Sequence, residues 1–428
     1  MIWRCLAAAI LVAMACTRPA IERPSAPAGG EELIVSEGQA TLVLDAKTGA
    51  TLRTLPAGVL SPAKDAIISL HSDPLACGGL EPPCTYVAAY DLRGKILEEW
   101  RLDDRYVLPA TYGPAPSGFS PNGRWLVLVK RDAALSTFAI LDLSAVGPRS
   151  AADGPELVRS AGGRAKGRWE QITLGSRFSF DAIHNDGAAL YIIEHPVAGS
   201  TAYNVRLYEV RSKRLVPEPI FDKAQLVTFD PTTGLMDGAF HASVAPTGGQ
   251  WSYGLYVRRD GRPFVHALNV AARYATCILD LPGTRSGSSM LALALRPDAR
   301  RLFVTDTGAG AVSEIDAETQ KVRRSGSFAG RAGSADGSRA LAVVSSDGSR
   351  LYATASRGIA VLGTADLALR SWAAPDLAVT ALALSADGSR LYALANGAVH
   401  VLEAPSGRPI AEHALPSNAR AITTVTVR

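Results

Sequence analysis

The amino-acid sequence predicts an all-β fold, a β-propeller of eight four-stranded blades, with seven blades as the fallback. Two short phrases recur along the chain, and each is typical of strands joined by tight turns. A third observation is that the repeat region begins and ends with strand-like segments that lack neighbours of their own. The composition agrees, because 47% of the residues are hydrophobic, 20% are charged and 39 are Gly, as in a turn-rich chain with a large core.

The first phrase is an apolar run, a turn that contains Asp or Asn, and a second apolar run. Asp-Gly and Asn-Gly supply the positive φ angles of tight hairpin turns, so the phrase predicts strand, turn, strand. We expect the turn Asp to hydrogen-bond its own backbone, with calcium binding as the alternative. Copies occur at residues 120–127, 296–303, 345–352 and 385–392, and weaker copies at 61–68 and 185–191.

The second phrase is a strand that ends in a polar residue and a turn, after which a further strand leaves. Four antiparallel strands in every ~40–50 residues are typical of a propeller blade. Eight copies indicate eight blades, although two of them, at Glu209 and Asn269, are identified by position only. The copies lie near Asp45, Asp91, Asp142, Glu209, Asn269, Asp316, Asp366 and Glu403.

The two ends of the repeat region each lack a partner strand. The first unit begins directly with a second strand at Glu32–Val35, whereas Ala421–Arg428 is a β-branched strand with nothing after it. We expect the C-terminal strand to complete the N-terminal blade, because closure of the ring removes free sheet edges that invite aggregation. Residues 31–428 then form a single β-propeller domain.

These phrases resemble the YVTN-type and the tryptophan-docking, quinoprotein-like propeller repeats over residues 31–428. The resemblance implies the fold and leaves the activity open, because propellers host both enzymes and binding modules. Only Trp100 occupies the position of the girdling tryptophan of tryptophan-docking propellers, so we predict no bound quinone and no other cofactor. We expect Trp100, Trp125 and Trp251 to pack between neighbouring blades.

The first residues are typical of a processing segment. A positive start precedes an apolar run that is too short to span a membrane, and Ala13–Cys16 resembles a bacterial lipobox. The resemblance implies that residues 1–15 are a signal peptide and that Cys16 carries a lipid, with ordinary cleavage after Ala15 as the alternative. Residues 16–30 are rich in Pro and Gly and predict a flexible tether. We therefore expect an extracytoplasmic protein that is lipid-anchored to the membrane, the outer membrane if the host has one.

Cysteine usage agrees with an extracytoplasmic compartment. Cys77 and Cys84 bracket a loop rich in Gly and Pro and are predicted to form a disulfide, which an oxidising compartment permits. No second Cys or His pair accompanies them at zinc-ligand spacing. Cys277 lies in a strand-like apolar run, so we expect a buried thiol there.

The charge balance gives no reason to expect a nucleic-acid partner, because 44 basic and 40 acidic residues leave a net charge of +4. One local basic stretch, Arg159, Arg164, Lys166 and Arg168, predicts a surface for an anionic partner, with a solvated loop as the alternative. We expect this stretch and the Cys77–Cys84 loop to lie on one rim, opposite the Asp-Gly hairpins. We expect the chain to be a monomer.

Linear motifs of catalysis are missing from the sequence. There is no nucleophile elbow, phosphate-binding loop or H-E-x-x-H pair, so no catalytic, cofactor-binding or metal-binding residue is predicted. His184 and His241 each follow an acid, Asp181 and Asp237, but we interpret both as loop or core histidines. The favoured function is a binding or scaffold module for a protein or glycan of the cell envelope. The alternative is an extracytoplasmic propeller enzyme, such as a lactonase, a lyase or a quinoprotein dehydrogenase.

Overall fold

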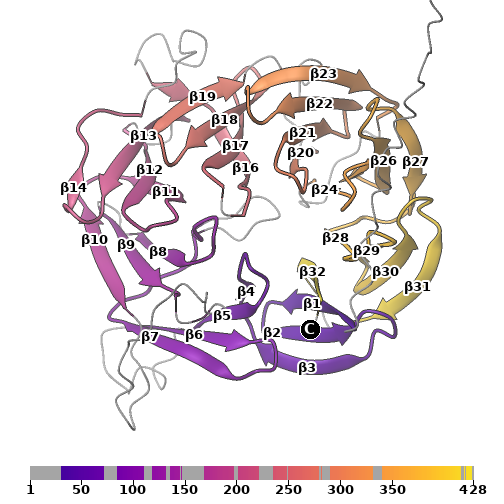
Figure 1. The fold of residues 1–428 in the computed structure, drawn as a ribbon, viewed down its shortest axis with the longest axis horizontal. Coiled ribbons are helices and arrows are strands. Elements are labelled where there is room, and N and C mark those ends of the chain that lie inside the picture. The colour runs from indigo at the N-terminus through magenta and orange to yellow at the C-terminus, as the bar shows by residue number, and fades with distance from the viewer. Residues whose placement is uncertain are drawn as a thin grey trace, which may run out of the picture.

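The structure, a computed structural model, is a ring of eight antiparallel β-sheets around a common axis (Figure 1). Among the residues described, no helix is long and apolar enough to cross a membrane. The predicted fold class, an all-β propeller of eight blades, is confirmed. The structure describes residues 30–71, 84–109, 118–131, 135–144, 146, 168–196, 201–220, 235–247, 249–278, 281, 290–330, 340–415, 419 and 421–426.

Most blades are built from four consecutive strands, with the first strand innermost and the fourth at the outer wall of the ring (Figure 1). Blade two contains β4 (Val59–Leu60), β5 (Ala66–His71), β6 (Thr85–Asp91) and β7 (Ile96–Leu102), and blade five contains β16 (Ala239–Val244), β17 (Trp251–Val257), β18 (Pro263–Asn269) and β19 (Tyr274–Ile278). Blade six contains β20 (Leu291–Leu295), β21 (Arg301–Asp306), β22 (Ala311–Asp316) and β23 (Lys321–Ser327). Blades seven and eight contain β24 (Ala342–Val344), β25 (Arg350–Thr354), β26 (Ile359–Gly363), β27 (Leu369–Ala373), β28 (Ala381–Leu384), β29 (Arg390–Ala395), β30 (Ala398–Glu403) and β31 (Pro409–Ala414).

Blades three and four depart from this plan. In blade three, isolated bridges join Val107 and Phe119 to the inner edge of its second strand. In blade four, a short extra strand pairs with the beginning of the third strand. The strands are β8 (Trp125–Arg131), β9 (Ser136–Asp142) and β10 (Trp169–Leu174) in blade three, and β11 (Phe178–Ile183), β12 (Ala189–Glu194), β13 (Ala202–Glu209), β14 (Arg214–Leu215) and the extra β15 (Met236–Asp237) in blade four.

Blade one confirms the predicted closure of the ring. From the axis outward it contains β32 (Ala421–Thr426), β1 (Glu31–Glu37), β2 (Ala40–Asp45) and β3 (Thr51–Pro56). The strands β32 and β1 pair antiparallel over the whole length of β32, and Figure 1 shows β32 on the inner side of β1. Ile422 is 5% exposed and packs in one cluster with residues of blades one and eight. The C-terminal strand therefore seals both a sheet and an interface between blades.

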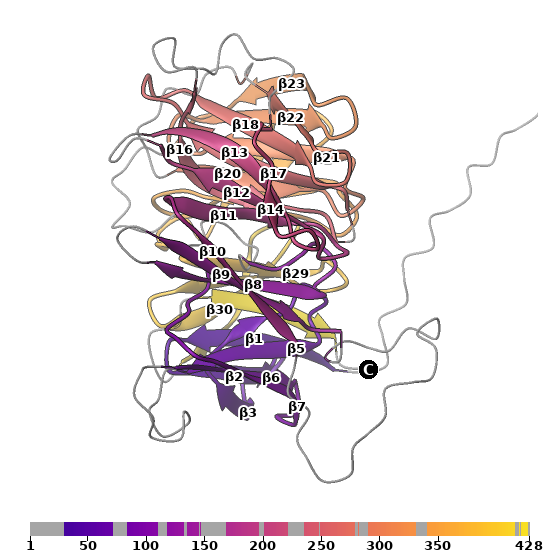
Figure 2. The same ribbon diagram turned by 90° about the vertical axis from the view of Figure 1, so that its left-hand side faces the viewer.

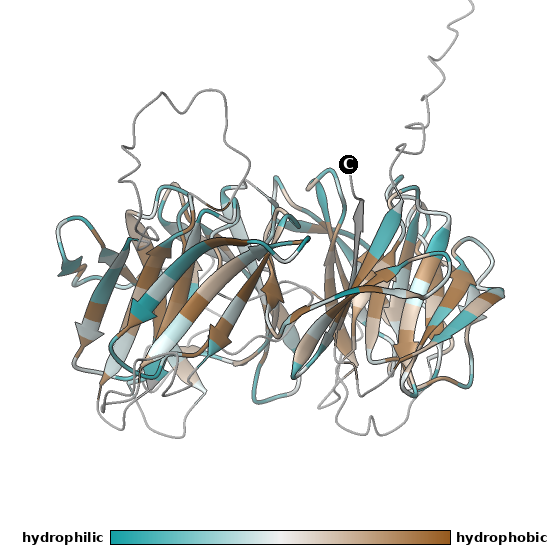
Figure 3. Ribbon diagram, turned by 90° about the horizontal axis from the view of Figure 1, so that it is seen from below, coloured by the Kyte–Doolittle hydropathy of each residue, from teal (hydrophilic) through white to brown (hydrophobic). Residues whose placement is uncertain are grey.

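The hydrophobic core lies between neighbouring blades. Figure 3 shows apolar residues concentrated in the strands and hydrophilic residues in many of the connections. Trp100 of blade two is 1% exposed and packs against blade three, and the indole N–H of Trp125 donates to the Asn185 carbonyl of blade four at 3.2 Å. Trp251 packs against a cluster shared by blades five and six. The predicted packing of these tryptophans between blades is confirmed.

Tyrosine hydroxyls also connect the blades. In several blades a Tyr of the second strand donates to a residue of the next blade, and in three cases the acceptor is the carbonyl that follows the third strand. Because burial leaves few alternative partners for such a hydroxyl, the contact orients one blade on the next. The donors and acceptors are Tyr191 and Val270 O (2.6 Å), Tyr253 and Ala317 O (3.2 Å), Tyr352 and Ala404 O (2.9 Å), and Tyr392 and the Glu31 carboxylate (2.9 Å).

The strands run from one side of the ring to the other, so their connections form two rims (Figure 2). We call the hairpin rim the one that carries the turns between first and second strands and between third and fourth strands. There Asp347 and Asp387 accept from the backbone N–H groups of Ser349 and Ser389, each at 2.9 Å. The predicted role of these residues in turns is confirmed.

Weakening β32 should destabilise the whole ring. We expect Ile422→Ala to lower the free energy of unfolding by about 2–4 kcal/mol, because it removes a side chain buried between two blades. The neighbouring Ala421 is exposed, so Ala421→Ser should change it by less than about 0.5 kcal/mol. Urea unfolding of both variants measures this. Equal stability of the two variants, or a chain truncated after residue 420 that melts like the wild type, would show that closure contributes nothing.

Candidate functional site

Two cavities lie on the inner side of the ring. The first, which we call the interblade cavity, has a volume of about 200 Å³ and lies among blades three, four and five. The second, the channel cavity, has a volume of about 420 Å³ and is lined by residues of blades one to five. Phe180, Asp181 and Ser243 line both cavities. These three residues therefore mark the junction between a side compartment and the central channel.

Asp181 reaches this junction because the strand that carries it is irregular. The register of β11 on β12 shifts between Phe180 and Ala182, which leaves Asp181 as the extra residue of a β-bulge. A bulge bends its strand and changes the direction of a side chain, and bulges are common beside binding sites. Blade five has the same irregularity at Phe240-His241-Ala242 in β16.

The Asp181 carboxylate is shielded from bulk water and incompletely paired. Its side chain is only partly buried because it borders the cavities, but its Oδ2 atom is buried without a hydrogen-bond partner among the described residues. Burial raises the pKa of Asp181 to about 7. A buried carboxylate without a partner favours the protonated form, because desolvation penalises the charge. Near neutral pH this group therefore exists in both protonation states.

Aromatic side chains form much of the wall of the interblade cavity. The rings of Tyr203 and Tyr256 stack with centroids 5.1 Å apart, and Phe240 packs edge-on against Tyr256 at 5.4 Å. Burial raises the pKa of both tyrosines well above their ordinary value, so the hydroxyls stay neutral. The two hydroxyls lie close enough to shift each other's pKa, but neither makes a hydrogen bond of good geometry with a described residue.

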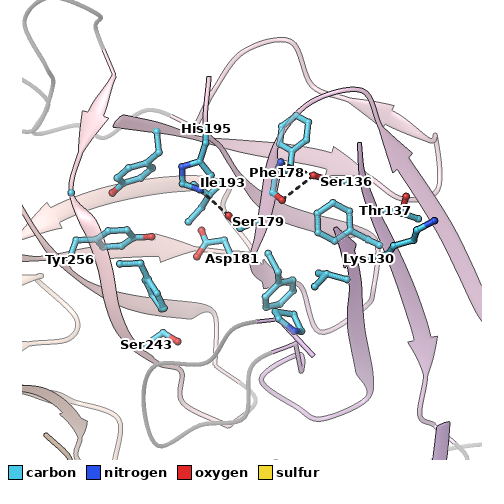
Figure 4. A pocket seen from close by; sticks show the side chains of 17 residues that line it. Lys130, Ser136, Thr137, Phe178, Ser179, Asp181, Ile193, His195, Ser243 and Tyr256 are labelled. Atoms are coloured by element: carbon cyan, nitrogen blue, oxygen red, sulfur yellow. Dashed lines mark hydrogen bonds between the residues drawn. The ribbon is translucent and has the colours of Figure 1, made fainter. Parts of the chain in front are cut away.

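Polar groups complete the wall of the interblade cavity (Figure 4). The imidazole Nε2 of His195 and the hydroxyl of Ser179 are 2.9 Å apart and hydrogen-bonded. Lys130 also lines the cavity, but its ammonium is hydrogen-bonded to the Asp104 carboxylate, and Figure 4 shows it directed away from Asp181. The positive charge of Lys130 is thus balanced by another carboxylate.

The channel cavity has a different lining from the interblade cavity. Side-chain hydroxyls supply most of its polar groups, and it has few aromatic rings. Its residues include those of the turns between first and second strands, so the cavity reaches the hairpin rim. Lys64 lies in one of these turns; burial lowers the pKa of its ammonium, and the negative charge of Glu31 opposes that shift. Eight lining residues carry a hydroxyl: Ser36, Thr41, Ser61, Ser120, Ser243, Thr247, Ser252 and Thr423.

Most of the predicted site residues lie outside the described residues. This applies to Cys16, to Cys77 and to Arg159, Arg164 and Lys166 of the basic stretch.

Three of the predicted residues are described. Cys84 is disulfide-bonded, with its partner outside the described residues, whereas Cys277 is a buried thiol as expected, with its Sγ 3.5 Å from Nδ1 of His266. Arg168 is exposed immediately before β10.

One expectation about surfaces is wrong. The connection that contains the basic stretch runs from β9 to β10, the third and fourth strands of blade three, so it leaves from the hairpin rim. The connection that precedes Cys84 joins β5 to β6, the second and third strands of blade two, so it leaves from the opposite rim. The strand ends that carry the two insertions therefore lie on opposite rims. The reason is that the fourth strand begins only at Trp169, after the basic residues.

The two histidines weighed from the sequence have structural partners. The His184 imidazole pairs with Asp186 at 2.7 Å in the hairpin turn, and Nε2 of His241 is 2.8 Å from the Leu291 carbonyl of blade six. The sequence reasoning missed the role of Asp181 and of His195. One signal was present, because Asp181 stands in an inner strand, whereas the inner strands of blades six and eight contain only Ala and Leu.

No cluster of three or more His, Cys, Asp or Glu side chains with metal-binding geometry occurs in the described part of the chain. The arrangement around Asp181 provides a proton acceptor with a raised pKa, a Ser–His pair and an apolar aromatic wall. Such a combination is typical of a binding or catalytic site.

Comparisons with known proteins place the chain by its fold. No family model matches the sequence, and no curated protein matches it either. Among solved structures it is similar to the dihydro-heme d1 dehydrogenase NirN in complex with DHE, with a TM-score of 0.52 and 14% identity over 93% of this chain and 76% of that chain. It also matches apo AztD from Citrobacter koseri, with a TM-score of 0.41 and 11% identity over 93% and 98% of the two chains. The chain is a β-propeller, and structural similarity at 11–14% sequence identity shows the fold alone.

Asp181→Asn should change how stability depends on pH. The folded pKa of about 7 lies above the ordinary value of 3.8, so the wild type loses stability as pH rises from about 4 through about 7. Relative to wild type, the variant should gain up to about 4 kcal/mol at pH 8, less than half of that at pH 5 and little below pH 4. Urea unfolding between pH 4 and 9 measures this. Asp376→Asn, which makes the same change at an exposed position, serves as the control. Parallel curves for wild type and Asp181→Asn would contradict the assignment.

Proposed function

We propose that this protein is an extracytoplasmic β-propeller, held at the membrane by a lipid on Cys16, that binds a glycan or protein of the cell envelope at its hairpin rim. The observation that carries the proposal is the channel cavity. It reaches the hairpin rim, and eight of its lining residues bear hydroxyls. Its volume of about 420 Å³ falls in the range of about 300–1,000 Å³ that is common for ligand sites.

The lining suits a ligand rich in hydroxyl groups. Ser and Thr hydroxyls both donate and accept hydrogen bonds, as sugar hydroxyls do, so those not used within a turn can pair with a sugar in either sense. The hydroxyls of Ser61 and Ser120 already donate to the side chains of Asp65 and Asn122 in their own turns. The wall also contains apolar patches such as Ile34 and Ile422, on which the carbon face of a sugar can rest. A glycan chain, or a protein loop that carries one, fits these walls.

Binding is favoured over hydrolysis by the count of carboxyl groups. Glycoside hydrolysis generally uses a pair of carboxyl groups on opposite sides of the scissile bond. The described lining of the two cavities contains a single carboxylate, that of Asp181. The two-carboxyl arrangement is therefore not met by the described residues.

The basic stretch indicates that the proposed partner is negatively charged. Its connection leaves blade three from the hairpin rim, where the channel cavity also reaches the surface, and Arg168 is exposed there. Arg168 adds positive charge to that rim, which favours an anionic glycan or protein, and the attraction weakens as salt screens it. We propose that Arg159, Arg164 and Lys166, which lie outside the described residues, add to this charge.

Blocking the channel mouth should abolish capture of the partner. Thr247 is exposed and lines the channel cavity, so Thr247→Trp fills the entrance and should lower partner recovery at least tenfold in pull-downs from envelope extracts. Glu318→Trp adds the same ring at an exposed turn beyond β22 and should leave recovery unchanged. Treating the extract with glycosidase or protease identifies the kind of partner. Equal recovery with both variants contradicts the proposal.

The anchor is tested separately. Metabolic labelling with a fatty acid should mark the wild type but not Cys16→Ser, and only the wild type should remain with the membrane fraction after a salt wash. Mutation of the acylated residue removes the thiol to which the lipid attaches. Equal labelling of both proteins would remove the anchor from the proposal and leave the binding site unaffected.

A further inference from the structure

The interblade cavity contains buried polar atoms that the described residues leave without a hydrogen bond of good geometry. Oδ2 of Asp181 is buried without a hydrogen-bond partner there, and the hydroxyls of Tyr203 and Tyr256 are buried without a hydrogen bond of good geometry. All three residues line the cavity, and Figure 4 shows the Asp181 carboxylate between Ser179 and Tyr256. An unpaired buried polar group costs free energy, and an ionised carboxylate can only accept, so Oδ2 of Asp181 suits a ligand that donates a hydrogen bond.

Ionised Asp181 also makes no ion pair with a lysine or arginine among the described residues. Lys130, the one lysine in the described lining, is bound to the Asp104 carboxylate and directed away from Asp181. No arginine lines the cavity within the described part of the chain. His195 is hydrogen-bonded to Ser179.

A second bulge in the same chain provides an internal comparison. His241 occupies the same position in β16 as Asp181 does in β11, next to a Phe and before an Ala. His241 reaches across to the neighbouring blade and meets the Leu291 carbonyl at 2.8 Å. Asp181 is directed into a cavity instead. The bulge therefore serves packing in blade five, whereas in blade four it presents a carboxylate to an open space.

The walls around the carboxylate are aromatic. Tyr203 and Tyr256 stack on each other, and Phe138, Phe178 and Phe240 line the same space. Aromatic faces attract cations, and the attraction grows where water is excluded. The volume of about 200 Å³ exceeds that of a cavity of about 150 Å³ that accepts benzene in another protein, so one ring with a short substituent fits.

We propose that the interblade cavity binds a small organic cation, an ammonium group on a short arm of an aromatic ring. The ammonium pairs with the Asp181 carboxylate and donates to the neighbouring tyrosine hydroxyls, and the ring packs among the aromatic side chains. The proposal goes beyond the proposed function, because the envelope partner occupies the channel mouth and the cation occupies the side compartment.

Binding of such a cation depends on pH through the site's own groups. Asp181, whose pKa burial raises to about 7, must be ionised to hold an ammonium, so affinity falls as pH drops. The other titratable groups that face it are His195, Tyr203 and Tyr256, with Lys130 held by Asp104 at the far wall. The tyrosines stay neutral. The pH dependence that remains in Asp181→Asn belongs to the other groups, His195 among them.

The experiment is isothermal titration calorimetry of the full chain with benzylammonium, and with benzyl alcohol and benzoate as neutral and anionic analogues. At pH 8 benzylammonium should bind at least tenfold more tightly than benzyl alcohol, and benzoate should not bind. Its affinity should be about tenfold lower at pH 6 than at pH 8, because the ionised fraction of a group with a pKa of about 7 falls by that factor. Titrations at pH 6 in buffers of different ionisation enthalpy should show release of close to one proton per ligand.

Three variants locate the site. Asp181→Asn should lose at least tenfold in benzylammonium affinity and keep its affinity for benzyl alcohol, whereas the exposed Asp376→Asn should bind like the wild type. Ser243→Phe, which fills the junction of the two cavities, should lose both ligands. Benzyl alcohol binding as tightly as benzylammonium, unchanged affinity in Asp181→Asn, or no proton release would overturn the proposal. Capture of the envelope partner is measured with Thr247→Trp, so failure of one proposal leaves the other standing.

Discussion

The pairing of β32 with β1 is the contact on which the rest of the structure depends. Each blade is a single sheet, and it buries its apolar side chains against the two neighbouring blades. An open ring would therefore expose the apolar faces of two blades at once. The hydrogen bond from Tyr392 to Glu31 repeats across this seam the contact that tyrosines make between other blades. Ile422 and Thr423 of β32 also line the channel cavity, so ring closure and the binding surface use the same strand.

Within this rigid ring, blade four contains the feature that most resembles a site. A protein that needed only stability would place an aliphatic residue at the position of Asp181, since the inner strands of blades six to eight consist of Ala, Val and Leu. The bulge instead holds a carboxylate in a space walled by aromatic rings, where its charge is costly. The ring tolerates the free-energy cost of this buried carboxylate because apolar clusters and tyrosine hydrogen bonds hold the surrounding blades together.

The two cavities differ in the chemistry of their linings. Hydroxyls line the channel near the hairpin rim, whereas aromatic rings and a single carboxylate line the compartment among blades three, four and five. Phe180, Asp181 and Ser243 connect the two. A ligand in the side compartment therefore lies beside the wall that a partner in the channel contacts, and the two occupants share these three residues.

The sequence by itself determined the eight blades, the four strands of most of them and the closing strand, because turn signals such as Asp347-Gly348 and strand periodicity are local and recur. Only the tertiary structure decided which residues meet. Asp181 and Tyr256 come from strands of two different blades, His195 follows the end of β12, and a one-residue bulge sets the direction of the Asp181 side chain. The tertiary structure also decided from which rim the connection with the basic stretch leaves. The answer depends on whether β10 begins before or after the basic residues. Local patterns specify strands and turns, but convergence of blades on an axis and the direction of a side chain at a bulge are set by packing.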